Sequence, residues 1–455
     1  MQSVQPKYGY GMTLSACLWL GLFPLLQGGT YATLTHDKWV IMLALTAATL
    51  LCFVFDLFLR FRGKARRLHA GPPGDVMPRR GILPFVSASA LILWTVLSCL
   101  FSAFGRETWW LGESVRYEGL ATQLCYFALF ACFFFSRVNL KPVLLSAAAG
   151  VALFFVIVLL QRGGANPLGL FPPGRSYALN PEFQGTVGNV DMGTGYLLLL
   201  AGLFLYALLN LFPPVRPSPS GASGSSRGAH IAWAVVLFSA LSVTVFLIVT
   251  MDVQFGAVTL AALFLVTLFR FLPKKLRLPL LILLVVLALL LVWFWPGQGG
   301  GLWELHEILR GRGRPSFGSN RVAVWDYSLR LAGENPLLGG GSGTFRIRFN
   351  QYLEENGLVI PEEQDGVLLP HYFDNPHNEY IARLTDNGLP AMLLFAALVL
   401  AAVFRRRDRL LPLLSPCGAA VFCYAVQAFF SFSVCIVAPL FWVLLGLSFR
   451  EAPEG

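Results

Sequence analysis

The stretch Leu278-Pro-Leu-Leu-Ile-Leu-Leu-Val-Val-Leu-Ala-Leu-Leu-Leu-Val-Trp-Phe-Trp-Pro296 contains no charged side chain. An apolar run of this length is long enough to cross a lipid bilayer as a helix. Similar runs recur along the 455-residue chain, of which 56% is apolar. The sequence therefore predicts an all-α fold: a polytopic integral membrane protein built as a bundle of transmembrane helices.

The apolar runs predict about twelve transmembrane helices. They cover residues 11–27, 39–59, 82–104, 118–136, 142–161, 190–212, 231–251, 253–271, 278–296, 387–404, 411–430 and 433–449. A long polar segment separates the ninth run from the tenth. We therefore expect transmembrane helices 1 to 9 in residues 1–296, a helical extracytoplasmic loop in residues 297–386, and transmembrane helices 10 to 12 in residues 387–455.

Basic residues gather in every second connection between these spans. The clusters are Arg60, Arg62, Lys64, Arg66, Arg67, Arg79 and Arg80; Arg137 and Lys141; Arg216 and Arg227; Arg270, Lys274, Lys275 and Arg277; and Arg405, Arg406, Arg407 and Arg409. Cytoplasmic loops carry such an excess of Lys and Arg. We therefore expect these connections and both termini in the cytoplasm, and residues 297–386 outside. The net charge of +10 is spread over these clusters, which argues against nucleic-acid binding.

The cysteines and two connecting segments predict no chemistry of their own. All eight cysteines lie in or beside apolar runs, a pattern typical of buried small side chains rather than of disulfides or a metal site. Residues 213–228 are rich in Pro, Ser and Gly and predict a flexible cytoplasmic linker, and residues 71–74 are similar.

The first functional stretch of the loop is Arg321-Val-Ala-Val-Trp325. Ser319-Asn320 can cap a helix from Arg321 to about residue 332, which Glu334-Asn-Pro336 ends. This places Arg321 in the first turn, where backbone amides already favour an anion. The apolar face is expected to hold Val322, Trp325, Leu329 and Ala332, with Asp326 paired to Arg330 on the other side.

The second stretch is Asn375-Pro-His-Asn-Glu-Tyr380. Asn375 is the expected helix cap, Pro376 the first helical residue and His377 part of the first turn, and Asn387-Gly388 ends the helix. The helix dipole favours a neutral imidazole there, and a neutral histidine can act as a general base. Two alternatives are a histidine with a purely structural role and a metal site formed by His371, Asp374 and His377, whose spacing fits no standard metal motif.

Between these stretches lies the glycine-rich segment Gly339-Gly-Gly-Ser-Gly-Thr-Phe345. A phosphate-binding loop needs a preceding strand and a following helix in a parallel sheet, and no such sheet is expected here. We therefore favour a sharp turn that brings backbone close to another part of the chain, over a direct phosphate cradle.

The chain resembles the O-antigen ligase and polymerase superfamily of membrane glycosyltransferases, which also includes protein O-oligosaccharyltransferases. The resemblance rests on the Arg321 stretch with Pro336 to Phe345, on His377-Asn-Glu-Tyr380 with Asn387-Gly388-Leu389, on Phe183-Gln-Gly-Thr-Val-Gly-Asn189, and on Arg116-Tyr-Glu-Gly119. The ordered combination is far more specific than any single piece.

The resemblance implies an inverting, metal-independent transfer without any cofactor. A glycan would move from an undecaprenyl diphosphate donor to the hydroxyl of a glycan, lipid or protein acceptor, at the outer face of the cell inner (cytoplasmic) membrane. It assigns Arg321 to the donor diphosphate and His377 to activation of the acceptor. It also implies substrate-binding roles for Arg116, Glu118, Asn189, Asn378 and Glu379. From the residues alone, Arg116 and Glu118 could equally form a surface salt pattern.

One feature departs from the family. Its members commonly have a Ser-Arg pair where this chain reads Asp252-Val-Gln-Phe-Gly256. Arg116, Arg162 or Arg175 could replace the missing charge. The sequence does not separate a ligase from a repeat-unit polymerase or a protein transferase, and between the first two we favour the ligase. The competing classes are a transporter or flippase for polyprenyl-linked sugars, disfavoured because mid-span positions are nearly all apolar, and a catalytically inactive scaffold.

Overall fold

The computed structural model describes residues 9–65, 81–113, 116–211, 227–364, 367–370, 372–404, 415–432 and 434–450. Several predictions concern residues outside these ranges. The linker at 71–74 lies outside them, as do all but the last two residues of the linker at 213–228. The basic residues at 66–80 and 405–409, Arg216, and His371 of the alternative metal site lie outside them too.

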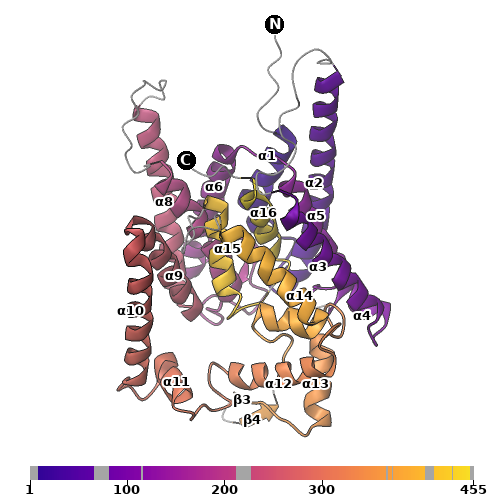
Figure 1. Ribbon diagram of the computed structural model, residues 1–455, viewed down its shortest axis with the longest axis vertical. Helices are drawn as coiled ribbons and strands as arrows, with labels where there is room; N and C mark the ends of the chain where they lie inside the picture. The colour runs from indigo at the N-terminus through magenta and orange to yellow at the C-terminus, as the bar shows by residue number, and fades with distance from the viewer. Residues whose placement is uncertain are drawn as a thin grey trace.

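The described chain is almost entirely helical, which confirms the predicted all-α membrane fold (Figure 1). Eight helices are long and apolar enough to cross a membrane: α2 (Leu34–Ala65), α3 (Leu83–Leu100), α6 (Leu140–Arg162), α7 (Val190–Leu209), α8 (Arg227–Met251), α9 (Gln254–Phe271), α10 (Lys274–Trp293) and α14 (Glu379–Val403). The chain is thus a multi-pass membrane protein.

Four further apolar segments are shorter. They are α1 (Tyr10–Cys17) with its continuations η1 (Leu18–Leu22) and η2 (Phe23–Leu25), α5 (Leu120–Phe134), α15 (Pro416–Gln427) and α16 (Ala438–Ser448). Each of the twelve predicted spans therefore coincides with an apolar helix, and within the described residues eight of these helices have spanning length. The count of twelve membrane crossings stays a prediction.

The centre of the bundle is α7, which is buried along most of its length. Gly202 allows this close packing, because a side chain there would meet the backbone carbonyl of Ala419 on α15 at 2.6 Å. By contrast, α10 is apolar all round and only Arg277 along it is buried. A helix with this pattern presents its surface to lipid.

The long loop forms a separate layer at one end of the bundle, at the bottom of Figure 1. It contains α11 (Gly300–Leu309), α12 (Arg321–Glu334), α13 (Phe345–Glu355) and the hairpin β3 (Pro361–Gln364) with β4 (Val367–Pro370). The layer has its own small core, built from Ala323, Val324, Leu331, Phe345, Phe349, Leu353, Ile360 and Phe373.

The helix predicted from Arg321 is confirmed, since α12 begins at that residue and ends at Glu334. The predicted Asp326–Arg330 pair is also present, at 2.8 Å. The predicted apolar face is wrong in part: Leu329 is 51% exposed, whereas Val324 and Leu331 are buried. The reason is that α13 packs on the Val324–Leu331 side through its phenylalanines.

The glycine-rich segment makes the close backbone approach that its composition predicts. Gly340 and Gly341 donate backbone N–H groups to the carbonyls of Thr385 and Asp386 on α14, at 3.1 and 2.7 Å. Gly388 breaks the helical geometry of α14 with φ +79°, and a side chain there would meet the Leu337 carbonyl at 1.9 Å. The turn therefore fastens the loop layer to the kink of α14.

Candidate functional site

The N-terminus of α14 differs from the prediction. The helix begins at Glu379, and its cap is Asn378, whose side chain accepts hydrogen bonds from the backbone N–H groups of Tyr380 (3.0 Å) and Ile381 (3.1 Å). The expected cap, Asn375, instead accepts a 2.8 Å bond from the N–H of His377. Both asparagines can close a local turn, and the left-handed backbone of His377 (φ +50°) decides between them.

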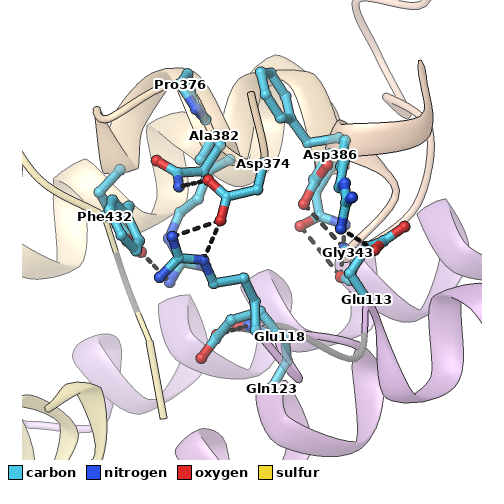
Figure 2. A pocket seen from close by; sticks show the side chains of 17 residues that line it. Glu113, Glu118, Gln123, Gly343, Asp374, Pro376, Ala382, Asp386 and Phe432 are labelled. Atoms are coloured by element: carbon cyan, nitrogen blue, oxygen red, sulfur yellow. Dashed lines mark hydrogen bonds and ion pairs between the residues drawn. The ribbon is translucent and has the colours of Figure 1, made fainter. Parts of the chain in front are cut away.

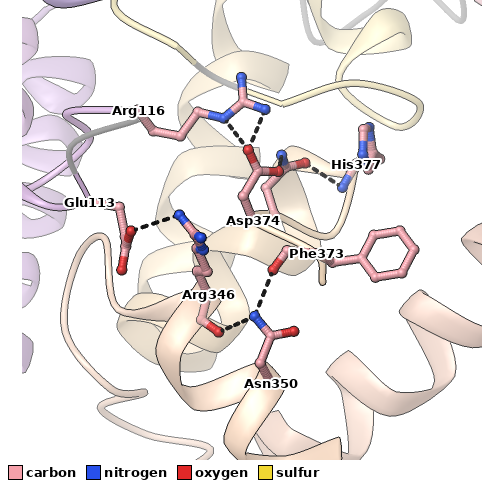
Figure 3. Close-up of polar contacts among 8 residues, drawn as sticks. Glu113, Arg116, Arg346, Asn350, Phe373, Asp374 and His377 are labelled. Atoms are coloured by element: carbon pink, nitrogen blue, oxygen red, sulfur yellow. Dashed lines mark hydrogen bonds and ion pairs between the residues drawn. The ribbon is translucent and has the colours of Figure 1, made fainter. Parts of the chain in front are cut away.

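His377 therefore lies immediately before the cap residue Asn378 and not in the first turn of the helix. Its imidazole packs edge-on against the ring of Phe432, with 5.2 Å between ring centroids. A non-glycine residue with positive φ is uncommon and costs free energy, so the surrounding structure must hold it. Asn375 supplies that support through its bond to the backbone of His377 (Figure 3).

Arg116 reaches the same place from the connection between α4 (Arg106–Leu111) and α5. Its Nε donates to Oδ2 of Asp374 at 2.7 Å, and the two side chains form an ion pair (Figure 3). The guanidinium carbon lies 4.2 Å from the centroid of Phe432. Arg116 and His377 therefore contact the same aromatic ring, although they are far apart in sequence.

Glu118 does not pair with Arg116 as a surface salt pattern would require. It accepts hydrogen bonds from the hydroxyl of Tyr126 at 2.7 Å and from Nε2 of Gln123 at 3.1 Å. The pKa of Glu118 is raised to about 8, chiefly because the carboxyl is buried; the hydrogen bond from Tyr126 acts to lower this pKa, and the nearby charge of Glu379 acts to raise it. Glu118 can therefore carry a proton at neutral pH.

Arg116 and Glu118 line a cavity between the helix ends and the loop layer, and His377 is not part of its lining (Figure 2). It encloses about 680 Å³ of empty space, including the part open to solvent. Three arginines and five carboxylates contribute to it, together with Phe345 and Phe432. The charged residues are Arg116, Arg346 and Arg383, and Glu113, Glu118, Asp374, Glu379 and Asp386.

Four of these charged residues, Glu113, Arg346, Arg383 and Asp386, were missed by the sequence analysis, and two of them, Arg383 and Asp386, lie on α14. Glu379 and Arg383 form a 2.7 Å ion pair that is almost fully buried, and Asp386 accepts a 3.0 Å bond from the N–H of Gly343. A signal was available in their spacing. Positions 379, 383 and 386 share one face of a helix that enters the membrane. Charged side chains in such a helix are rare and usually mark a functional site.

Arg321 belongs to a second cluster, beside the N-terminus of α7. Its Nη1 donates to the Gly318 carbonyl at 3.2 Å, and its charge interacts with the carboxylate of Asp191. Its Nε is buried and has no hydrogen-bond partner among the described residues. The predicted side-chain cap is absent: Ser319 and Asn320 both have positive φ, and Asn320 makes no capping bond.

The predicted residue Asn189 caps α7 by accepting a 2.8 Å bond from the N–H of Asp191. It ends the hairpin of β1 (Phe183–Gln184) and β2 (Gly188–Asn189). Arg162 links the same hairpin to α8. Its Nη2 donates to Oε1 of Gln184 in the hairpin at 2.8 Å and to the Thr250 carbonyl of α8 at 3.2 Å. Arg162 thus lies at the end of α8, beside the segment where the Ser-Arg pair is missing.

The predicted residues therefore fall into two groups. Arg116, Glu118 and Glu379 line the cavity, whereas Arg321 and Asn189 lie around the N-terminus of α7. Trp325, one turn after Arg321, connects the groups by donating its indole N–H to the Pro376 carbonyl at 2.8 Å. Among the described residues, no three His, Cys, Asp or Glu side chains gather closely enough to hold a metal ion.

Comparison with known families identifies part of this architecture. The family described as O-antigen ligase matches residues 238–396, from α8 through the loop layer to the second half of α14. The matched segment contains Arg321 and His377. No curated protein matches the chain. Together with the helical membrane fold, the match over residues 238–396 supports an assignment to the O-antigen ligase-like superfamily of polytopic membrane glycosyltransferases.

Proposed function

We propose that the protein transfers a glycan from an undecaprenyl diphosphate donor to the hydroxyl of an acceptor, as an O-antigen ligase does. The observation that carries the proposal is the position of His377, held in a left-handed conformation beside Phe432 and Arg116, within the segment that matches the O-antigen ligase family. The loop layer would lie at the outer face of the cytoplasmic membrane, as the distribution of basic residues supports.

In this proposal His377 is the general base. The acceptor hydroxyl oxygen forms a bond to the anomeric carbon of the donor while the bond from that carbon to the phosphate oxygen breaks. The hydroxyl proton moves to the imidazole, and the diphosphate leaves with the electron pair. Attack from the side opposite the leaving group inverts the anomeric configuration.

Arginines would stabilise the departing diphosphate. The Nε of Arg321 is buried without a partner among the described residues, so a phosphate oxygen could accept its hydrogen bond. Asp191, in the first turn of α7, interacts with Arg321, so the N-terminus of α7 lies near this arginine. The free backbone amides of that N-terminus also favour an anion. Arg162 is the best candidate to replace the missing Ser-Arg pair, because it already reaches the end of α8. Guanidinium groups can neutralise the developing charge without a metal ion.

The cavity side would bind the acceptor or the donor glycan, with Arg116, Glu118 and Glu379 as substrate-binding residues. Asn378 and Asn189 would act indirectly, since both cap the helices that carry these groups. Polymerisation of repeat units and transfer to protein use the same chemistry and differ only in the acceptor. We favour the ligase function among them.

Transfer by the purified protein in detergent tests the proposal. The donor is an undecaprenyl diphosphate oligosaccharide, the acceptors are a panel of lipids, glycans and peptides, and a chelator is present throughout. His377→Ala should abolish transfer, while His230→Ala, which removes an exposed histidine at the start of α8, should leave the rate unchanged. Arg321→Lys should lower transfer at least tenfold, whereas Arg330→Lys on the same helix should not.

Each result bears on a distinct part of the mechanism. Full activity of His377→Ala would remove the histidine as the base, and loss of activity with chelator in the wild type would remove the metal-independent mechanism. Absence of transfer from a folded protein, together with movement of the lipid-linked sugar across vesicles, would replace the proposal with a flippase. The acceptor that is used identifies the ligase, polymerase or protein-transferase subclass.

A further inference from the structure

The cavity contains three buried polar atoms that lack hydrogen-bond partners among the described residues. They are Oε2 of Glu379, Nε of Arg383 and Oδ1 of Asp386. Glu379 is 2% exposed and Arg383 is 7% exposed, so bulk water does not supply the missing hydrogen bonds. A buried polar group without a partner destabilises the fold, because nothing replaces the hydrogen bonds that it made to water. Such groups therefore indicate a ligand that completes their bonding.

The three atoms are already oriented by their neighbours. The other oxygen of Glu379 binds Arg383 at 2.7 Å, and the other oxygen of Asp386 accepts the N–H of Gly343 at 3.0 Å. Positions 379, 383 and 386 share one face of α14, and all three residues line the cavity. They offer two acceptors and one N–H donor. A hydroxyl group can both donate and accept, so adjacent hydroxyls match this set.

The charge of the cavity argues against a phosphate in it. Five carboxylates and three guanidinium groups line the wall, and Arg116, Arg346 and Arg383 each have a carboxylate partner. Each guanidinium charge is therefore already balanced by a carboxylate, and the wall offers an anion no unpaired positive charge. The walls also include Phe345 and Phe432, which supply apolar surface beside the polar groups. A neutral ring with hydroxyls at its edge and C–H groups on its faces suits such a pocket.

We infer that this cavity is a sugar subsite, in which Glu379, Arg383 and Asp386 bind the hydroxyls of one neutral ring of a glycan substrate. The inference rests on the proposed function, because that function supplies the glycans. The ring can come from the acceptor or from the donor oligosaccharide. In either case the subsite is distinct from the diphosphate side at Arg321 and Arg162.

Direct binding tests the subsite without any turnover. The full-length protein in lipid nanodiscs is mixed with methyl glycosides of glucose, galactose, mannose and N-acetylglucosamine, and saturation-transfer NMR reports which of them bind. At least one glycoside should bind, and Asp386→Asn and Glu379→Gln should weaken its affinity at least fivefold. Asp326→Asn, which alters an exposed ion pair on α12, should leave binding and transfer unchanged.

Two substitutions guard against loss of folding. Asp386→Asn keeps an oxygen that can accept the Gly343 bond, so it tests the subsite if Glu379→Gln does not fold. Binding of no glycoside by the folded wild type, or equal binding by wild type and the folded cavity variants, would overturn the inference. Displacement of a bound glycoside from the cavity by inorganic pyrophosphate would overturn it too, because that result makes the cavity an anion site.

Further arms identify the source of the sugar and separate the two proposals. Competition by the free acceptor glycan assigns the ring to the acceptor, and competition by the donor oligosaccharide assigns it to the donor; both support a sugar subsite. His377→Ala should bind glycosides as the wild type does even though it transfers nothing. Sugar binding without transfer in the wild type would contradict the proposed function alone, and transfer without sugar binding in the cavity would contradict the subsite alone.

Discussion

The indole N–H of Trp325 donates a 2.8 Å hydrogen bond to the carbonyl oxygen of Pro376, the residue before His377. This bond ties α12, and Arg321 at its start, to the backbone that carries the proposed base. Because the two side chains come from stretches more than fifty positions apart, their relative position depends on such a link.

Trp325→Phe tests the importance of that link. The substitution keeps an aromatic ring but removes the donor, so the free energy of unfolding should fall by only about 1 kcal/mol. Transfer should slow about tenfold, because misplacement of a reacting group costs rate steeply. Trp303→Phe, which alters a ring packed on Phe317 in the same layer, is the matched control. Equal rates in both variants would show that the bond is dispensable.

The ion pair of Arg116 and Asp374 should behave as one unit. Both side chains are 25% exposed, so the direct electrostatic contribution to stability is modest. Arg116→Lys loses the geometry of the guanidinium group, and Asp374→Asn loses its charge partner. The kcat/KM of the double variant should be only slightly lower than that of the less active single variant. Losses that multiply would mean that the two residues act independently, as we expect of the exposed pair Asp326 and Arg330.

Glu118 should make the stability of the protein depend on pH. Its pKa is raised to about 8 from the ordinary 4.5, so the folded state retains a proton that the unfolded state loses. The stabilisation is complete below pH 4.5 and is lost as the pH rises through about 8. In this window the slope is at most about 1.4 kcal/mol per pH unit. Glu118→Gln, which resembles the protonated form, should flatten that decline.

Thermal unfolding in nanodiscs between pH 5 and 9 measures the effect. The wild type should lose more thermal stability than Glu118→Gln as the pH increases, and the two curves should diverge most between pH 6 and 8. Parallel curves would place the pKa of Glu118 in its ordinary range.

Gly388→Ala should disrupt the attachment of the loop layer. The backbone at this position has φ +79°, and the new Cβ would lie 1.9 Å from the Leu337 carbonyl, which cannot move without breaking the turn. We expect a loss of several kcal/mol or no folded protein. Gly333→Ala on α12 is the control, because nothing lies within 4 Å of its Cβ and helical Ala is favoured over Gly. Similar stability of both variants would contradict this packing.

Local features of the fold followed from the sequence because their causes are local. The start of α12 at Arg321, its end at Glu334 and the close turn at Gly339 to Gly343 depend on residues within a few positions of each other. The positive φ angles of Asn320 and His377 did not follow, because tertiary contacts impose them.

The cavity could be predicted only in fragments. Arg116 and Glu379 were identified through the family resemblance, but the partner of Arg116, Asp374, is 258 positions away. No periodic pattern indicates such a contact. Phe432, which contacts both Arg116 and His377, was hidden in an apolar run, where an additional phenylalanine carries no signal.

The short helices α15 and α16 bear on how a membrane-bound donor reaches His377. With 12 and 11 residues they are only about 18 and 17 Å long, against a hydrocarbon thickness of about 30 Å. Most of their residues are buried against neighbouring helices, so lipid does not need to match their length. Phe432, between these two helices, contacts Arg116 and His377. Because both helices are short, we expect this contact to lie below the level of the longer helix ends, and in the proposed mechanism a polyprenyl donor would present its first sugar there while its tail stays in the lipid.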